Sequence, residues 1–260
     1  MLRRSPYEEA VRRSVTSIVC VCGRYVVAKT LSGALPDLLD NLEGWNPEFE
    51  NFNIPPTADI PVVVRRIDAQ SGEAQRAIDW VHWGFVPAWK KSFTERPQPV
   101  NARIEGAATN GMFREAFRHR HCIVPASGYY EWSVNADGVK QPFYIRGLAG
   151  RGLAMAGLFE EWTDAASPAG EASPVRRTAT IITRSALGDI TSIHDRMPVL
   201  LGPDDYDTWL AGEFATAAEA LSFLETASNA TARSFEAYAV GTAVGNVRNN
   251  GPQLIDALSA

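Results

Sequence analysis

Cysteine is scarce in this 260-residue chain, which holds Cys20, Cys22 and Cys122 and no others. An odd number of cysteines at uneven spacing excludes a disulfide framework and favours a reducing, cytoplasmic setting. One residue separates Cys20 from Cys22, whereas paired zinc ligands are usually two to four residues apart. The sequence therefore predicts neither a disulfide-stabilised secreted domain nor a metal site.

Long apolar runs and an excess of positive charge are also missing. No stretch of about 18 apolar residues occurs, which excludes a transmembrane helix. The net charge of −5 argues against a protein that coats nucleic acid with an overall basic surface, but it leaves room for a local basic groove. The composition, 45% hydrophobic and 21% charged, is that of a globular protein large enough to bury a core without staples.

Twenty Gly and 16 Pro indicate many turns and short strands rather than a helix bundle. No shift in composition marks a domain boundary, so residues 20–260 are expected to form one compact, β-rich α+β domain. Residues 1–19 carry four Arg and look detached, which suggests a frayed extension or a start set too early. The patterns predict strands at 19–30, 61–67, 77–85, 121–131, 141–146, 152–158, 177–183 and 234–240, helices at 30–42, 103–120, 203–210 and 214–227, and loops at 43–58 and 87–99.

Three reactive side chains stand out. Cys22 is a candidate nucleophile, although most cysteines of this kind are simply buried. Glu131 lies between Tyr130 and Trp132, an aromatic setting that is expected to raise the pKa of its carboxyl and suit it to acid–base chemistry; the alternative is an outward-facing strand residue. His194 can exchange protons near neutral pH, and its alternative is a loop residue that hydrogen-bonds the backbone.

A basic stretch interleaved with aromatic residues points to single-stranded nucleic acid. Residues 90–121 contain seven Lys or Arg and three Glu, a net charge of +4, and Trp83 and Trp89 precede it. Such a stretch offers charge for phosphates and flat faces for bases. Within it, Asn101 and Arg103 would face the same way on an extended segment, as needed to position a reactive group and hold a phosphate. The alternative is a solvated basic surface beside core aromatics.

Eight segments, in order along residues 22–256, together resemble the SOS-response-associated peptidase (SRAP) family, whose members crosslink covalently to abasic sites in single-stranded DNA. The segments are CGRY at 22–25, FNIPPT at 52–57, WGFVPAW at 83–89, NARIEGA at 101–107, GYYEW at 128–132, QPFYI at 141–145, IHDRMP at 193–198 and AVGNVRNNG at 243–251.

The resemblance implies a compact β-rich domain with a basic groove, working as a monomer on abasic single-stranded DNA, with no cofactor, metal or membrane. It also implies the roles of individual residues. Cys22 would be the nucleophile, oriented by Asn101, and Glu131 and His194 would be the other catalytic residues. The residues implied in DNA binding are Arg24 and Arg103, which would hold the backbone, and Asn53, Pro56 and Trp83, which would shape the pocket and the DNA path.

The implied chemistry needs Cys22 at the N-terminus, because only there does a cysteine offer an amine and a thiol on adjacent carbons. An amine condenses with the aldehyde of a ring-opened abasic site, and the thiol closes the imine to a thiazolidine. In this sequence 21 residues precede Cys22. Either translation starts at Val21, since a GUG codon is read as Met at a start, or the protein cleaves its own leader. The mis-set start is the favoured explanation.

Two other functions fit the same residues. In a cysteine autopeptidase that acts on its own leader, Cys22, His194 and Asn101 would be nucleophile, base and orienting residue. A non-catalytic single-strand-binding module would need only the basic stretch. Covalent adducts that depend on abasic sites, loss of the leader without DNA, and salt-reversible binding that ignores abasic sites distinguish the three.

Overall fold

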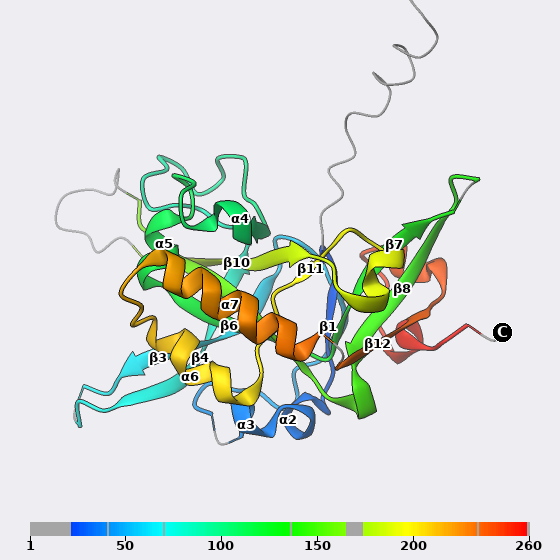
Figure 1. Cartoon of the computed structure of the whole chain (residues 1–260), viewed down its shortest axis with the longest axis horizontal. Coiled ribbons are helices and arrows are strands. Elements are labelled where there is room, and N and C mark those ends of the chain that lie inside the picture. The colour runs from blue at the N-terminus through cyan, green and yellow to red at the C-terminus, as the bar shows by residue number, and fades with distance from the viewer. Residues whose placement is uncertain are drawn as a thin grey trace, which may run out of the picture.

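Two β-sheets organise the computed structural model, which describes residues 22–258 except 41, 70, 136, 165–173 and 233. The proposed extension over residues 1–19 lies outside these described residues. The smaller sheet has the strand order β12-β8-β7-β1-β2 and stands at the right of Figure 1. Its strands are β1 (Tyr25–Val27), β2 (Asn51–Ile54), β7 (Gly128–Val134), β8 (Lys140–Gly147) and β12 (Phe235–Ala239).

The larger sheet has the strand order β11-β10-β4-β3-β6-β9. A further pairing of β9 with β10 joins the last strand of this order to the second one. In this sheet β10 runs parallel to β4 and to β5, and all the other strand pairs are antiparallel. The strands are β3 (Asp59–Ile67), β4 (Ala74–Trp83), β5 (Asn101–Arg103), β6 (His121–Ala126), β9 (Leu153–Trp162), β10 (Arg176–Ser185) and β11 (Arg196–Pro198). The α+β, strand-rich fold expected from the sequence is confirmed.

The segment expected as a single strand over 121–131 is two strands that belong to different sheets. β6 pairs with β9 in the larger sheet, and β7 pairs with β8 and β1 in the smaller one. The chain changes sheets at Ser127, whose backbone N–H donates to Val26 O. A side chain at Gly128 would bring its Cβ within 2.5 Å of Ile145 O, so the close approach at this corner requires glycine. This corner places Tyr129 opposite Tyr25 of β1, with Glu131 two residues further along β7.

Three of the four expected helices are shorter than the patterns predicted. The helix expected at 30–42 is split into α2 (Leu31–Ala34) and α3 (Pro36–Leu39), because Pro36 can begin a helix but cannot continue one. The helix expected at 103–120 consists of α4 (Ile104–Ala107) and α5 (Arg114–His119), separated by a turn. The long helix α7 (Ala217–Thr231) is confirmed, and Thr216 caps it by accepting from Glu219 N. The helix expected at 203–210 is a 3-10 turn followed by α6 (Tyr206–Ala211).

Three short strands lie where no strand was expected. β2 falls within the expected loop 43–58, β5 lies just before the expected helix 103–120 and takes its first residue, and β11 falls within the IHDRMP segment. Strands of three or four residues are too short to show an alternating pattern, and they form because longer neighbours supply their hydrogen bonds. β2 and β5 carry Asn53 and Asn101, and β11 begins two residues after His194.

Most of the buried hydrophobic residues form one core cluster, which includes Cys22, Tyr25, Tyr129 and Met155. A second, smaller cluster lies on the other face of the smaller sheet and includes Val26 and Tyr130. Alternation along β1 and β7 therefore sorts their side chains between the two clusters. Among the described residues, no helix combines the length and apolar character that crossing a membrane requires.

Candidate active site

Cys22 and Glu131 meet at the entrance to β1. The backbone N–H of Cys22 donates to Glu131 Oε1 across 2.5 Å, although 109 residues separate the two. The pairing of β1 with β7, which sets Tyr25 opposite Tyr129, brings them together. Cys22 has φ of 47°, in the left-handed region that costs a residue with a side chain about 1–2 kcal/mol. Strain at this point fits a functional position, because backbone strain concentrates at such sites.

Burial raises the pKa of Glu131 to about 8. The backbone hydrogen bonds from Cys22 and Trp132 work against this shift, and the charge of Asp195 adds to it. At pH 7 a carboxyl with this pKa is roughly nine-tenths protonated. Glu131 is therefore an acid that holds its proton near neutral pH, in contact with the nitrogen of Cys22.

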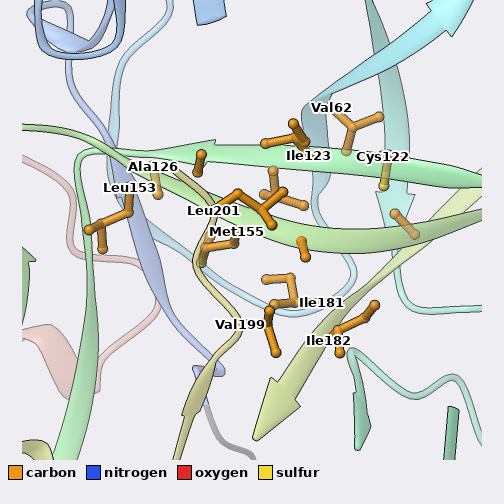
Figure 2. Packing of buried hydrophobic residues seen from close by; sticks show 14 of the residues in the cluster. Val62, Cys122, Ile123, Ala126, Leu153, Met155, Ile181, Ile182, Val199 and Leu201 are labelled. Carbon is orange, nitrogen blue, oxygen red and sulfur yellow. The ribbon is translucent and has the colours of Figure 1, made fainter. Parts of the chain in front are cut away.

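The Cys22 side chain points into the core between the sheets. Its Sγ lies 3.8 Å from the Sδ of Met155, and the residue is fully buried. Figure 2 shows Met155 within the packed cluster, together with Cys122, Val199 and Leu201. Burial also raises the pKa of the Cys122 thiol far above its usual range, so Cys122 is a structural residue of β6.

His194 lies in the short link between a 3-10 turn (Gly188–Ser192) and β11. Its Nδ1 accepts a hydrogen bond of 3.0 Å from the backbone N–H of Arg196, and Asp195 Oδ1 also lies 3.0 Å from Nδ1. The Arg196 N–H calls for an acceptor at Nδ1, whereas the Asp195 carboxylate calls for a donor there, so the two contacts favour opposite tautomers of the neutral ring. The Arg196 guanidinium binds both carboxylate oxygens of Glu105, at 2.6 and 2.9 Å, and this fork ties the His194 segment to α4.

Asn101 is the first residue of β5, the strand that pairs with β10, and its side chain is half-buried. The residue before it, Val100, accepts a hydrogen bond of 3.0 Å from Nε1 of Trp83. Trp83 itself is fully buried and packs edge-on against the ring of Tyr25, with 5.3 Å between ring centroids. Trp83 thus supports β1 and β5 from within, and its indole does not reach the surface.

Arg24 and Asn53 join β1 and β2 to the C-terminal segment. Arg24 Nη1 donates to Asn53 Oδ1 at 2.8 Å and to Val244 O at 3.0 Å. The Asn53 amide, which is buried, donates to the carbonyls of Val244, Asn246 and Asn249. The AVGNVRNNG segment is therefore a structural partner of these two residues.

Pro56 and Arg103 are nearer the surface. Pro56 is half-buried in the turn between β2 and β3, and Arg103 is exposed at the end of β5. Within the basic stretch, Lys90 is instead buried, and its Nζ donates to the carbonyls of Glu95 and Pro97. Lys90 thus braces its own loop, so it adds nothing to a surface for phosphates.

Trp89 is the aromatic residue of this region that stands exposed, at 64% of its surface. The family resemblance implied that Trp83 shapes the pocket and the DNA path, but the exposed indole of the WGFVPAW segment is Trp89. The signal that would have singled it out is its place after Pro87, in a segment with no strand pattern and next to Lys90 and Lys91. Among the described residues, no group of three or more His, Cys, Asp or Glu could hold a metal ion.

The chain matches the SOS response associated peptidase (SRAP) family over residues 21–247 and belongs to that family, as the eight segments indicated. It is similar to Abasic site processing protein YedK of Escherichia coli K12, with 29% identity over 239 residues, 90% of this chain and 99% of that protein. Abasic site processing protein YoqW of Bacillus subtilis 168 is 30% identical over 241 residues, covering 91% of this chain and 99% of that protein.

Similarity extends to vertebrate proteins and to solved structures. Abasic site processing protein HMCES of Gallus gallus is 27% identical over 234 residues, 79% of this chain and 65% of that protein. A crystal structure of a protein from Bacteroides thetaiotaomicron superposes with a TM-score of 0.69 at 22% identity, covering 92% of this chain and all of that one. At that identity the structural match establishes the fold alone.

Proposed function

We propose that this protein, as a cytoplasmic monomer, processes abasic sites in single-stranded DNA by forming a thiazolidine with Cys22 as its N-terminal residue. The observation that carries the proposal is the 2.5 Å contact between the Cys22 nitrogen and Glu131 Oε1. In a chain that starts at Cys22, that nitrogen is the α-amine. The names of the relatives YedK, YoqW and HMCES support abasic sites as the substrate.

The α-amine begins the reaction by attacking the aldehyde carbon of the ring-opened sugar. With a pKa of about 7.7–8.0, an α-amine is roughly a tenth free base at pH 7, several hundredfold more than a lysine. Protonated Glu131 gives its proton to the hydroxyl of the carbinolamine, which leaves as water and produces an iminium ion. Glu131 is then a carboxylate beside the new C=N bond.

The thiol completes the crosslink. The Glu131 carboxylate takes the proton of the Cys22 thiol, and the sulfur adds to the iminium carbon to close a five-membered ring. The carbon–oxygen double bond is lost, one C–N and one C–S bond form, one water leaves, and Glu131 regains its proton. Neither an oxidant nor a metal is needed for this balance.

The other candidate residues prepare the substrate. His194 would assist opening of the deoxyribose ring, while Asn101 would orient Cys22. Arg103, which is exposed, and the half-buried Arg24 would hold phosphates. The buried Asn53 and Trp83, with Pro56, would shape the walls of the site. Trp89, exposed beside this stretch, would stack on a base.

A second candidate function, self-cleavage before Cys22, is favoured by the strained backbone at that residue. The Cys22 sulfur would attack the carbonyl carbon of Val21, and Glu131 would protonate the departing nitrogen that it already contacts. Water would then hydrolyse the thioester and release the leader. Cleavage relieves the left-handed φ of Cys22 and creates the α-amine that crosslinking requires.

Two forms of the protein test the proposal. One is the 260-residue chain, and the other starts at Cys22 after removal of a Met that replaces Val21. Each is incubated with single-stranded DNA that contains an abasic site, and with the same DNA after reduction of the aldehyde to an alcohol. We expect a denaturation-stable adduct for the Cys22 form with the aldehyde alone. Equal yield from an uncleaved 260-residue chain would overturn the aminothiol mechanism, and leader loss without DNA would establish self-cleavage.

A further inference from the structure

Tyr25 and Tyr129 are two fully buried tyrosines that face the Cys22 thiol side of the smaller sheet. They lie directly opposite each other in the pairing of β1 with β7. Both belong to the same core cluster as Cys22 and Met155, whereas the next residue of β7, Tyr130, belongs to the cluster on the other face. Glu131, two residues beyond Tyr129, returns to the Cys22 side.

Neither hydroxyl has a hydrogen-bond partner among the residues that the structure describes. Of the three tyrosines of the smaller sheet that lie outside this cluster, two have a hydrogen bond that satisfies the hydroxyl: Tyr130 donates to Phe52 O at 2.8 Å and Tyr238 to Ile255 O at 3.1 Å. A buried hydroxyl without a partner is costly, and phenylalanine would fill the same space without that cost. Two such hydroxyls in the cluster that holds Cys22 point to an acceptor that forms during the reaction.

The nearby charge identifies that acceptor. Burial raises the pKa of both phenols well above the usual range, and the negative charge of a Cys22 thiolate raises each further. The charge of Glu131 also raises the pKa of Tyr129. Both phenols therefore remain O–H donors at neutral pH, close enough to the Cys22 sulfur to interact with its charge.

We propose that the Tyr25 and Tyr129 hydroxyls donate hydrogen bonds to the Cys22 sulfur as it becomes a thiolate and stabilise it for ring closure. A thiolate in an apolar core needs such donors, because burial disfavours the charged form. Met155, the contact partner of the thiol, is a thioether and has no proton to donate. This role rests on the proposed function, since it places both tyrosines as positioning residues for the second, sulfur-dependent bond.

Removing each hydroxyl alone tests the proposal. Tyr25→Phe and Tyr129→Phe are compared with the parent and with Tyr130→Phe, a matched control on the same strand. The pKa of the Cys22 thiol is measured in the full chain from the ultraviolet absorbance of the thiolate, as the difference from a Cys22→Ser variant. All the described tyrosines have a raised pKa, and the difference from Cys22→Ser removes the tyrosine absorbance that the two proteins share.

We expect each of the two variants to raise the thiol pKa by about one unit and to slow adduct formation by the Cys22-start form about tenfold. Tyr130→Phe should lower the melting temperature and leave the thiol pKa unchanged. An unchanged thiol pKa and a higher melting temperature in Tyr25→Phe and Tyr129→Phe would overturn the proposal. If the parent does not crosslink but the two variants still raise the thiol pKa, the proposed function fails and the donor role stands.

Discussion

Replacing Glu131 with Gln should remove a large pH dependence from the stability of the folded chain. The ordinary pKa of this carboxyl is 4.5, and burial raises it to about 8 in the folded protein. Below 4.5 the group is protonated in both states, so the folded protein keeps its full stability. As the pH rises from 4.5 to 8, the unfolded chain ionises first, and stability falls because the folded state holds the proton.

The size of the effect follows from the width of that window. Each pH unit between the two pKa values changes the free energy of unfolding by about 1.4 kcal/mol. Between pH 5 and pH 8, Glu131 alone therefore lowers the stability of the parent by roughly 3–4 kcal/mol. Gln keeps the oxygen that accepts from the Cys22 N–H but has no proton to lose, so the variant lacks this decline.

Urea unfolding of the 260-residue chain at several pH values between 5 and 8 measures the difference. The gap between Glu131→Gln and the parent should grow in favour of the variant as the pH rises. A matched control is Glu161→Gln, which removes an exposed carboxylate paired with Arg177 and should cost at most about 1 kcal/mol. Parallel curves for Glu131→Gln and the parent would refute the buried, protonated carboxyl on which the acid role depends.

The remaining predictions concern the reaction and the DNA path. Cys22→Ala keeps the amine and should yield a transient imine; a stable adduct without borohydride would contradict the mechanism. His194→Ala should slow crosslinking about 10²–10⁴-fold at unchanged DNA affinity, measured by single turnover. Arg103→Ala should flatten the salt dependence of binding by about one unit without lowering the melting temperature, whereas Arg24→Ala should do both; an unchanged slope removes either from the DNA path. Trp89→Ala should cost about 1–3 kcal/mol of binding and no stability.

The fold class and the longer elements could be predicted from the sequence because their patterns are local. β3 carries a continuous apolar run, β4 alternates towards its end and α7 has helical spacing, and the structure has all three close to the expected bounds. The division of residues 121–131 could not be predicted from hydrophobicity, which is continuous across both strands. The residue that marks the division is Gly128. A side chain there would clash with Ile145 O, and this close approach becomes evident only in the folded structure.

The candidate site was only partly accessible to sequence reasoning. An aromatic setting predicted a raised pKa for Glu131, and the shift to about 8 agrees with that prediction. The contact with Cys22 spans 109 residues, so no spacing along the chain could predict it. Trp83 and Trp89 look alike in one short motif, and only the fold shows that the first is buried and the second exposed. Asn53 likewise looks like a surface loop residue until the C-terminal carbonyls surround its amide.

The central claim is that one carbon of the abasic site bonds both the nitrogen and the sulfur of an N-terminal Cys22. Tandem mass spectrometry of the adduct between the cell-made protein and an abasic oligonucleotide tests it most directly. The account predicts a protein that begins at Cys22 and an adduct whose mass equals protein plus DNA less one water. In the tandem spectrum, the mass contributed by the DNA should remain attached to Cys22. An adduct on a chain that retains Met1, or DNA attached to a lysine, would contradict it.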